Sequence, residues 1–344
     1  MATVEMERAT LMKAAVRRVY GEADVVHVEQ VGRPSIARNE VLVRVHAAGV
    51  DRGVWHLMTG LPYLFRTAGI GVRTPKDPSL GMDLAGVVEA VGGDVTKFRP
   101  GDEVFGVGAG SFAEYARARA DRLAIKPANL TFEEAAAVAV SASTALLAVR
   151  DHGHVQSGQE VLVIGASGGV GSYAVQIAKA FGARVTGVCS PSKLELVRLL
   201  GADAVIDYTQ VSGEDLAAAV REANAGQGMS AVYDGVGKDT FDASLASLIT
   251  RGMLVLYGAS SGPVPPLDPQ RLNRGGSLYL TRPTLRHYLR TRDEFLWRAE
   301  EVLGSLADGT LRVEIGGRYP LDEAARAYED LENRRTTGKL LLTR

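Results

Sequence analysis

The hydrophobic and polar positions follow two different patterns along this chain. In the first third, short runs rich in β-branched residues alternate apolar and polar side chains, as in "EVLVRVHAAGV" (Glu40–Val50). Alternation of this kind is typical of a half-buried strand. "LAGVVEAVG" and "DEVFGVG" follow at short spacing, with the turn sequence "KFRPGD" between them. The pattern predicts a small β-rich domain at the start of the chain.

The pattern changes near Thr131. The stretch "TFEEAAAVAVSASTALLAV" begins with Thr131 and carries Glu134 three residues later, which predicts a capping box and an alanine-rich helix. Candidate strands and helices then alternate, which predicts an α/β fold with a doubly wound parallel sheet. The predicted strands are Val161–Gly165, Arg184–Cys189, Ala204–Asp207, Ala231–Asp234, Met253–Tyr257 and Leu278–Leu280, and the helices between them include Ser172–Phe181 and Lys193–Leu200.

The end of the chain does not continue this alternation. An amphipathic stretch, "RDEFLWRAEEVLGSLADG", is followed by a strand, a helix at Leu321–Glu332 and a final strand, "KLLLT". We expect these elements to return to the first domain and complete it. The predicted domains are therefore 1–131 completed by 283–344, and 132–282.

Composition narrows the class of protein. A chain of 344 residues has room for two domain cores, and 46% hydrophobic with 23% charged residues is ordinary for a globular enzyme. The formal net charge of −1 gives no overall attraction to nucleic acid or to an anionic membrane. The first dozen residues lack the apolar core of a signal peptide, and the folded part is predicted to begin near Met12. No apolar run reaches the roughly 18–20 residues that span a bilayer, so we expect a cytoplasmic protein.

The most informative segment is "VLVIGASGGVGSYAVQIAKAFGA", in which a buried strand leads into a glycine turn and a helix. Ala166, Gly168 and Gly171 form an A-x-G-x-x-G variant of the dinucleotide fingerprint, preceded by Gly165. Glycines allow a tight turn and bring backbone N–H groups close to a pyrophosphate, and the helix N-terminus adds positive potential. The alternative is a structural glycine turn in an α/β fold.

The end of the next strand indicates which dinucleotide binds. NAD-binding proteins carry an acid about 20 residues beyond the glycines, for the ribose 2′-hydroxyl. Here the strand ends "GVCSPSK", with Cys189 or Ser190 at that position and no acid. Ser190 can donate a hydrogen bond to a phosphate and Lys193 supplies charge, which favours NADPH. The alternative for Lys193 is an ordinary solvated helix lysine.

The chain resembles the medium-chain dehydrogenase/reductase superfamily, and within it the zinc-free quinone oxidoreductase branch. The resemblance extends from about Met12 to Leu342. It depends on the phosphate-loop segment and on "GMDLAGVVEAVG", "GDEVFG", "LGADAVIDY", "YGASSG", "GGSLYLTRPTLRHYL" and "TTGKLLL". It implies a barrel-like, GroES-like N-terminal catalytic domain completed by the C-terminus, with a Rossmann domain inserted. It also implies a homodimer formed through the edges of the Rossmann sheets.

The resemblance also implies a set of cofactor positions. Ser190, Lys193, Tyr208 and Arg334 match positions around the 2′-phosphate, and Thr144, Gly258 and Ser260 match positions along the nicotinamide half. Together with the loop, the expected NADPH-binding residues are Thr144, Ala166, Ser167, Gly168, Gly169, Val170, Gly171, Ser190, Lys193, Tyr208, Gly258, Ser260 and Arg334.

No metal site is expected. Zinc-dependent relatives carry a Cys near position 51, a His at 82 and a second Cys near 140, whereas this chain has Asp51, Met82 and Val140. One carboxylate does not make a zinc site, which needs three protein ligands and an open position. Cys189 is the only cysteine in the chain, so an internal disulfide and a cysteine-based metal site are also excluded.

Without a Lewis acid, hydride transfer to an electron-poor acceptor is easier than alcohol oxidation. A quinone or an enone spreads the incoming negative charge to an oxygen, where one or two hydrogen-bond donors suffice. The expected donors lie in "GVDRGVWHLMTGLPY", where His56 can donate a hydrogen bond or a proton. Quinone reductases carry Asn at position 51 and Tyr at position 56, so Asp51 and His56 are both departures from their pattern.

Each of these candidates has an alternative reading. His56 can be a packed or solvated histidine. Asp51 can orient the ribose or His56, or be protonated in a dry site. Tyr63 is a candidate for the substrate wall, while Trp55 and Phe65 read as core or pocket lining rather than as catalytic residues.

The sequence therefore predicts an NADPH-dependent, metal-independent reductase that acts on quinones. The first alternative is an enone or enoyl reductase, which reduces a carbon–carbon double bond. The second is a non-catalytic NADPH-binding sensor.

The basic run "TRPTLRHYLRTR" is interpreted as a solvated face rather than an RNA site, because the net charge is near zero and no aromatic platform accompanies it. The expected partners are a small-molecule substrate and a second copy of the chain, with no membrane or nucleic acid.

Overall fold

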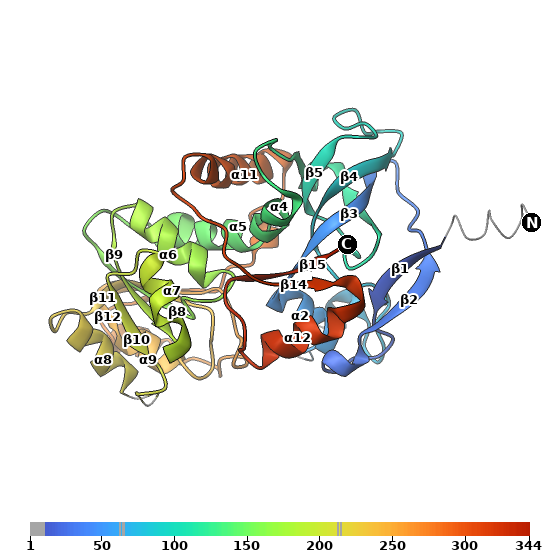
Figure 1. Cartoon of the computed structure of the whole chain (residues 1–344). Helices are drawn as coiled ribbons and strands as arrows, with labels where there is room; N and C mark the ends of the chain where they lie inside the picture. Colours follow the sequence, from blue (N-terminus) through green and yellow to red (C-terminus); the bar gives the residue numbers. More distant parts are fainter. Residues whose placement is uncertain (1–10, 62, 64–65, 212, 214) are drawn as a thin grey trace, which may run out of the picture. The chain divides into compact units, whose positions relative to one another are not determined.

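The structure is a computed structural model that describes residues 11–344 except 62, 64, 65, 212 and 214 (Figure 1). Contacts divide the chain into two units. The first unit runs to Val140 and includes 291–299 and 315–344, and the second comprises 141–290 and 300–314. The first described strand, β1 (Leu11–Val16), begins one residue before the predicted start at Met12. The residues before Leu11 and the predicted lining residue Phe65 lie outside the described part of the chain.

The first unit is built on strands. β1 pairs antiparallel with β2 (His27–Gly32). Within the described residues, a second sheet has the strand order β14-β15-β3-β4-β5-β7, and β6 also pairs with β3. Its strands are β3 (Glu40–Val50), β4 (Asp83–Val91), β5 (Glu103–Val107), β6 (Tyr115–Arg119), β7 (Leu123–Ile125), β14 (Ile315–Pro320) and β15 (Lys339–Thr343). The C-terminal strands therefore complete this sheet, as predicted.

β3 shows why the sequence pattern was informative. Its residues alternate between half-buried and buried up to Ala47, and the last four residues are all buried. The alternating part has one face toward the core, and the buried part lies between β4 and β15, which both pair with it antiparallel. β3 is therefore the strand that brings the start of β4 and the start of β15 to the same region of the first unit.

The first unit also contains helices. They are α2 (Arg52–Thr59), α4 (Phe132–Val138) and α12 (Ala324–Glu332), and α11 (Arg292–Ala307) contributes its first half. Thr131 and Glu134 form the predicted capping box at the start of α4, with both reciprocal hydrogen bonds present. α2 follows β3 after its N-cap, Asp51, and ends at Thr59, where the C-cap Gly60 has φ of 63°.

The second unit is the predicted doubly wound domain. Within the described residues it has a parallel sheet with strand order β10-β9-β8-β11-β12-β13. The strands are β8 (Glu160–Ile164), β9 (Arg184–Cys189), β10 (Ala204–Asp207), β11 (Met229–Asp234), β12 (Leu248–Leu256) and β13 (Tyr279–Thr281). The order reverses between β8 and β11, which is the switch point where such sheets bind ligands. The connecting helices are α5 (Ser141–Leu146), α6 (Gly171–Ala180), α7 (Leu194–Leu199), α8 (Leu216–Ala223), α9 (Phe241–Ala246) and α10 (Gln270–Arg274).

The observed units differ from the predicted domains at two places. Residues 132–140 belong to the first unit, not to the second as predicted, because α4 packs against β3, β4 and β15 of the first unit's sheet. In the C-terminal third, residues 283–290 and 300–314 belong to the second unit, not to the first as predicted. The reason is local pairing. In the first half of α11, Arg292 donates hydrogen bonds to the carbonyls of Ala120 and Leu123. Beyond the helix, the side-chain amide of Gln176 donates to the Arg312 carbonyl and accepts from the Arg312 N–H.

One helical run, Phe132–His152, is long and apolar enough to cross a membrane by length and composition. It comprises α4, α5 and the turns that follow, and 72% of its most apolar window is buried inside the protein. Burial of this extent is what the core helix of a folded protein shows.

Candidate active site

The phosphate loop adopts the strand–turn–helix arrangement that its sequence predicted. β8 ends at Ile164, Gly165 takes φ of 77°, and α6 begins at Gly171. A Cβ added to Gly171 would lie 2.1 Å from the carbonyl oxygen of Gly165, so the first turn of the helix approaches the end of the strand too closely for any side chain. The turn is held by hydrogen bonds from the Gly168 N–H to the Gly165 carbonyl and from the Ser172 N–H to the Gly168 carbonyl.

This loop has the chemistry of an anion site. Ala166 and Ser167 are buried, while Gly168, Gly169 and Val170 are half-buried at the end of the sheet. Their backbone N–H groups lie at the N-terminus of α6, a helix of 10 residues. Backbone donors at a helix N-terminus favour a negatively charged group such as a pyrophosphate. The close approach at Gly171 is the tight packing of helix on strand that the last glycine of a dinucleotide fingerprint provides.

The residues predicted for the 2′-phosphate gather at the neighbouring strand ends. Asp207 pairs with Cys189 in register, and the Tyr208 N–H donates to the Cys189 carbonyl at 3.2 Å. Ser190 and Lys193 follow directly, joined by a hydrogen bond from the Lys193 N–H to the Ser190 carbonyl. The structure thus brings Ser190, Lys193 and Tyr208 together.

The two candidates for the ribose position, Cys189 and Ser190, differ in their exposure to solvent. The thiol of Cys189 is buried, and burial raises its pKa, whereas Ser190 is half-exposed. Ser190 is therefore the accessible residue at the end of β9. The nearest acid in the pairing, Asp207, ends β10 rather than β9 and accepts hydrogen bonds from the N–H and hydroxyl of Thr209. The strand end that would carry the acid of an NAD-binding protein has none.

The predicted nicotinamide-side residues also belong to the second unit. Thr144 lies on α5 and is half-buried, and Gly258 and Ser260 follow β12. The Gly258 N–H donates to the Asp234 carbonyl, and a Cβ at Gly258 would lie 2.3 Å from the Gly235 carbonyl oxygen. Arg334 differs from the other predicted cofactor residues, because it belongs to the first unit, after α12, with φ of 57°.

Asp234 is a residue that sequence reasoning missed. It ends β11, is fully buried and accepts four hydrogen bonds: from the N–H groups of Val236 and Gly237 at 2.7 and 3.0 Å, and from the hydroxyls of Thr240 and Ser244, both at 2.8 Å. These bonds shape the turn that follows β11 at the switch point of the sheet. The available signal was an acid at the end of a predicted strand directly before "GVG".

The three predicted catalytic residues lie at or after the start of α2. Asp51 is the N-cap of this helix, and its Oδ1 accepts from the Val54 N–H at 3.1 Å. His56 lies on α2, where its Nδ1 donates to the Leu61 carbonyl at 2.8 Å, because a carbonyl oxygen can only accept. In the neutral ring Nε2 is then an acceptor, and it becomes a donor when the ring is protonated.

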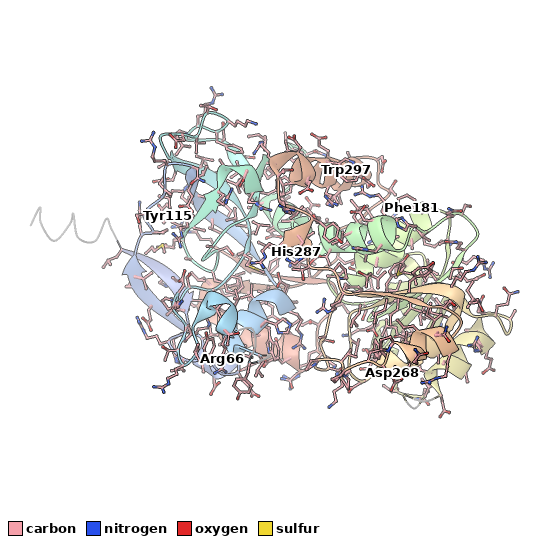
Figure 2. The ribbon with its side chains drawn as sticks, turned by 180° about the vertical axis from the view of Figure 1, so that it is seen from behind. Arg66, Tyr115, Phe181, Asp268, His287 and Trp297 are labelled. Atoms are coloured by element: carbon pink, nitrogen blue, oxygen red, sulfur yellow. The ribbon has the colours of Figure 1, made fainter. Side chains whose placement is uncertain are left out.

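Tyr63 is 70% exposed, which is high for a residue predicted to form a substrate wall. Its ring lies against the guanidinium of Arg66, 4.6 Å from the ring centroid, and the same guanidinium lies 4.2 Å from the ring of Tyr20. Arg66 also donates to the carbonyls of Gly60 and Thr59. Figure 2 labels Arg66 beside the helix that carries His56. Arg66 therefore connects the rings of Tyr63 and Tyr20 to the carbonyl groups at the end of α2.

A buried ionic cluster stands beside the N-cap of α2. The ammonium of Lys339, at the start of β15, lies 2.6 Å from Oδ2 of Asp83 and 3.3 Å from Oδ2 of Asp51. The side chains of Lys339 and Asp83 are 1% and 0% exposed. Burial raises the pKa of Asp83 to about 7, opposed by the charge of Lys339 and supported by the charge of Asp51. The hydroxyl of Tyr328 is also buried, and burial beside Asp51 and Asp83 raises its pKa well above the usual range.

This cluster includes or adjoins two of the positions that hold zinc in the metal-dependent relatives. Asp51 and Met82 stand at two of those positions, and Met82 packs against the apolar core of the first unit. Among the described residues, no three His, Cys, Asp or Glu side chains are grouped as metal ligands would be. In this chain an ammonium group lies between the carboxylate of Asp51 and that of the residue after Met82.

Fold and site together define a two-unit dehydrogenase or reductase with a dinucleotide-binding parallel sheet. The family described as "Alcohol dehydrogenase GroES-like domain" matches residues 37–128, and the family described as "Zinc-binding dehydrogenase" matches 169–300. The quinone oxidoreductase of Pseudomonas aeruginosa is 38% identical over 94% of this chain and 97% of its own length. The chain therefore belongs to the quinone oxidoreductase branch of the medium-chain dehydrogenase/reductase superfamily, as its motifs predicted.

Two further relatives extend this comparison. The mycobacterial protein Rv1454c, solved in complex with NADPH, superimposes with a TM-score of 0.89 at 39% identity and covers 97% of this chain and 100% of its own. The 2-haloacrylate reductase of a Burkholderia species is 32% identical over 96% of this chain and 99% of its own length. The predicted fold class, a GroES-like domain plus a Rossmann domain, is confirmed.

Proposed function

We propose that this protein is an NADPH-dependent reductase that transfers hydride to quinones without a metal ion. The observation that carries the proposal is the end of the parallel sheet in the second unit. A glycine loop at the switch point stands beside a strand end that has Ser190 and Lys193 in place of an acid. That combination supports a dinucleotide with a phosphate on its ribose.

Residues of this chain would bind the successive parts of NADPH. Within the loop from Ala166 to Gly171, the N–H groups of Ala166 and Gly168 donate to the carbonyls of Val188 and Gly165, so the N–H groups of the other loop residues would hold the pyrophosphate. Gly171 lets the helix pack closely against the end of β8. The Ser190 hydroxyl, the Lys193 ammonium and the Tyr208 hydroxyl would hold the 2′-phosphate. Thr144, Gly258 and Ser260 would line the nicotinamide half, and Arg334 would add a further charge. When bound, NADPH supplies the hydride.

The second unit is also organised for this role by Asp234. Its four hydrogen bonds fix the turn after β11, and that turn supports Gly258 through the close approach to Gly235. We propose that Asp234 keeps this end of the sheet open for the cofactor. A turn held by a fully satisfied carboxylate needs no rearrangement when the cofactor binds.

The first unit would provide the proton. Reduction of a quinone adds one hydride and leaves negative charge on an oxygen, which needs a proton or a hydrogen-bond donor. We propose His56 for this role: with Nδ1 donating to Leu61, the protonated ring presents Nε2 as its other donor. Asp51 is a hydrogen-bond acceptor in the structure, toward Val54 and Lys339, and we assign it a positioning role. Tyr63 would form part of the wall of the substrate site.

The test is NADPH oxidation at 340 nm against 1,4-benzoquinone, 9,10-phenanthrenequinone, a cyclic enone, a 2-alkenal and a simple aldehyde, with and without EDTA. Quinone turnover that EDTA does not change supports the proposal. Activity confined to the aldehyde, or abolished by EDTA, contradicts it. His56→Phe should lower kcat for the quinone about 10²-fold with unchanged NADPH affinity, the usual lower range for loss of a proton donor.

A second candidate is reduction of an activated carbon–carbon double bond. The similarity to the 2-haloacrylate reductase, over nearly the full length of both chains, favours it. The same site would serve, because an enone also places negative charge on an oxygen after hydride addition. Turnover of the enone and 2-alkenal without the quinones would select this candidate. NADPH binding without turnover of any acceptor would instead indicate a sensor.

We propose that the protein acts in the cytoplasm as a homodimer. Edge strand β13 carries Tyr279, which is 56% exposed, and a row of unpaired backbone groups at such an edge can pair with a second copy. Sedimentation analysis of the wild type and Tyr279→Lys tests the assembly. A wild-type monomer, or a variant dimer of unchanged affinity, would refute this interface.

A further inference from the structure

The buried ionic cluster of Asp51, Asp83 and Lys339 joins three elements of the first unit that are far apart in sequence. Lys339 begins β15, Asp83 begins β4, and Asp51 caps α2. The ammonium lies between the two carboxylates at 2.6 and 3.3 Å, and its side chain is almost fully buried. Burying charges costs free energy that the pairing must offset, so such a cluster is weak support for a purely stabilising role.

The middle strand of the sheet makes room for this cluster. Gly49 lies on β3, which pairs with β15 on one side and with β4 on the other. A Cβ at Gly49 would lie 2.5 Å from Oδ2 of Asp83 and 2.6 Å from Cε of Lys339. The ion pair therefore crosses β3 at a residue without a side chain, and a methyl group there would push the two partners apart.

Asp51 links this cross-strand pair to α2. Its Oδ2 faces the ammonium of Lys339, while its Oδ1 accepts from the Val54 N–H at the start of the helix. One carboxylate thus makes both contacts, and fixing one oxygen fixes the other. α2 in turn carries His56, which is proposed as the proton donor, and Trp55, whose indole N–H donates to Glu332 of α12.

We propose that Lys339 is a positioning residue for the reduction: its ammonium holds Asp51 against the N-terminus of α2 and so sets the place of His56. The proposal rests on the proposed function. Lys339 itself transfers no proton and touches no substrate in this scheme. Lys339, which lies 288 residues from Asp51 in sequence, would thus determine how precisely α2 presents His56.

The competing explanation is that the cluster only holds the sheet together. The double variant Asp83→Asn/Lys339→Met separates the two, because it removes both members of the close ion pair and leaves no buried ammonium or fully buried carboxylate. Exchanging a buried ion pair for apolar side chains of similar volume is often neutral for stability, and the double variant likewise leaves neither partner of the pair charged. Asp51 stays in place, but nothing holds its second oxygen.

Gly49→Ala provides an independent perturbation, because it keeps all three charged residues and displaces the pair by steric overlap. Gly32→Ala is its matched control: Gly32 also lies on a strand, β2, and a Cβ there has no heavy atom within 4 Å. Both glycines have ordinary backbone angles, so alanine introduces no φ strain at either position.

The experiment uses the full chain and three measurements: NADPH affinity by fluorescence titration, kcat and KM for 1,4-benzoquinone, and hydrogen exchange of the peptide that covers α2. For the double variant and for Gly49→Ala we expect NADPH affinity within twofold and KM within threefold of wild type. The expected kcat is at least tenfold lower, with faster exchange confined to α2. Gly32→Ala should match the wild type in all three.

Two results would overturn the proposal: a folded double variant with kcat within twofold of wild type, or a reduced kcat with unchanged exchange at α2. If Gly49→Ala does not fold, the double variant alone decides. A wild-type protein that binds NADPH but reduces no quinone would refute the proposed function. Hydrogen exchange of α2 then still tests whether Lys339 holds Asp51 against the N-terminus of α2, and unchanged exchange in the double variant would refute that role.

Discussion

The preference for NADPH over NADH depends on one side chain in a way that can be measured directly. Lys193 ends the turn that follows β9, directly beside Ser190, and is half-buried. A charge-assisted hydrogen bond from its ammonium to a 2′-phosphate is worth about 1.5–3 kcal/mol. Lys193→Ala should therefore weaken NADPH binding about 10- to 150-fold, because each 1.4 kcal/mol is a factor of ten. NADH has no 2′-phosphate, so its affinity should stay within twofold.

The assay is a fluorescence titration of each cofactor at two salt concentrations. Screening weakens a charge contact, so the NADPH advantage of the wild type should shrink at high salt and that of the variant should change little. Lys97→Ala is the matched control, an exposed lysine in the turn between β4 and β5 of the first unit. Equal loss of NADPH and NADH affinity in Lys193→Ala, or no loss of either, would refute the assignment.

Three further changes test other parts of the structure. Gly171→Ala places a Cβ 2.1 Å from the Gly165 carbonyl oxygen and should lower NADPH affinity at least tenfold, while Gly304→Ala, with no atom within 4 Å, should not change it. Asp234→Ala leaves two hydroxyls and two N–H groups without their acceptor and should lower the unfolding free energy by about 3–5 kcal/mol, measured by urea denaturation, with Asp234→Asn losing less. A pKa of about 7 for Asp83 lies above its unfolded value, so the folded state binds the extra proton between about pH 4 and 7. As the pH rises from about 4 to about 7, the free energy of unfolding of the wild type should fall by up to about 1.4 kcal/mol per pH unit relative to that of Asp83→Asn. Parallel pH profiles of the two proteins would refute the raised pKa of Asp83.

The parts of this protein that the sequence predicted are those specified by local rules. The strands Arg184–Cys189 and Ala204–Asp207 were predicted at their observed bounds, because each is a short apolar run closed by turn residues. The capping box at Thr131 is a contact between residues three apart. The phosphate loop joins a strand, a turn and a helix that are consecutive in the chain, so its shape follows from the spacing of its glycines.

The parts that the sequence did not predict depend on residues that are distant in the chain. The division of α11 between the two units follows from which partners its two halves meet, and amphipathic periodicity does not specify partners. Asp234 was missed because its role depends on a tight turn and on hydroxyls from the following helix. For Asp51 the sequence left open an orienting role, toward the ribose or His56, and a protonated carboxyl; its contacts in the structure, as a helix cap paired with Lys339, involve a residue 288 positions away.

The sequence by itself determined that this chain has a β-rich domain, a doubly wound domain and a dinucleotide loop without an acid at the ribose position. These features are encoded in periodicity and short motifs, where each residue acts on its near neighbours. Only the tertiary structure decided that Lys339 and Asp83, which are 256 residues apart, meet across Gly49 and hold the N-cap of α2. Sheet pairing brings three strand ends together, and that pairing follows from burial of the whole core rather than from any short segment of the chain.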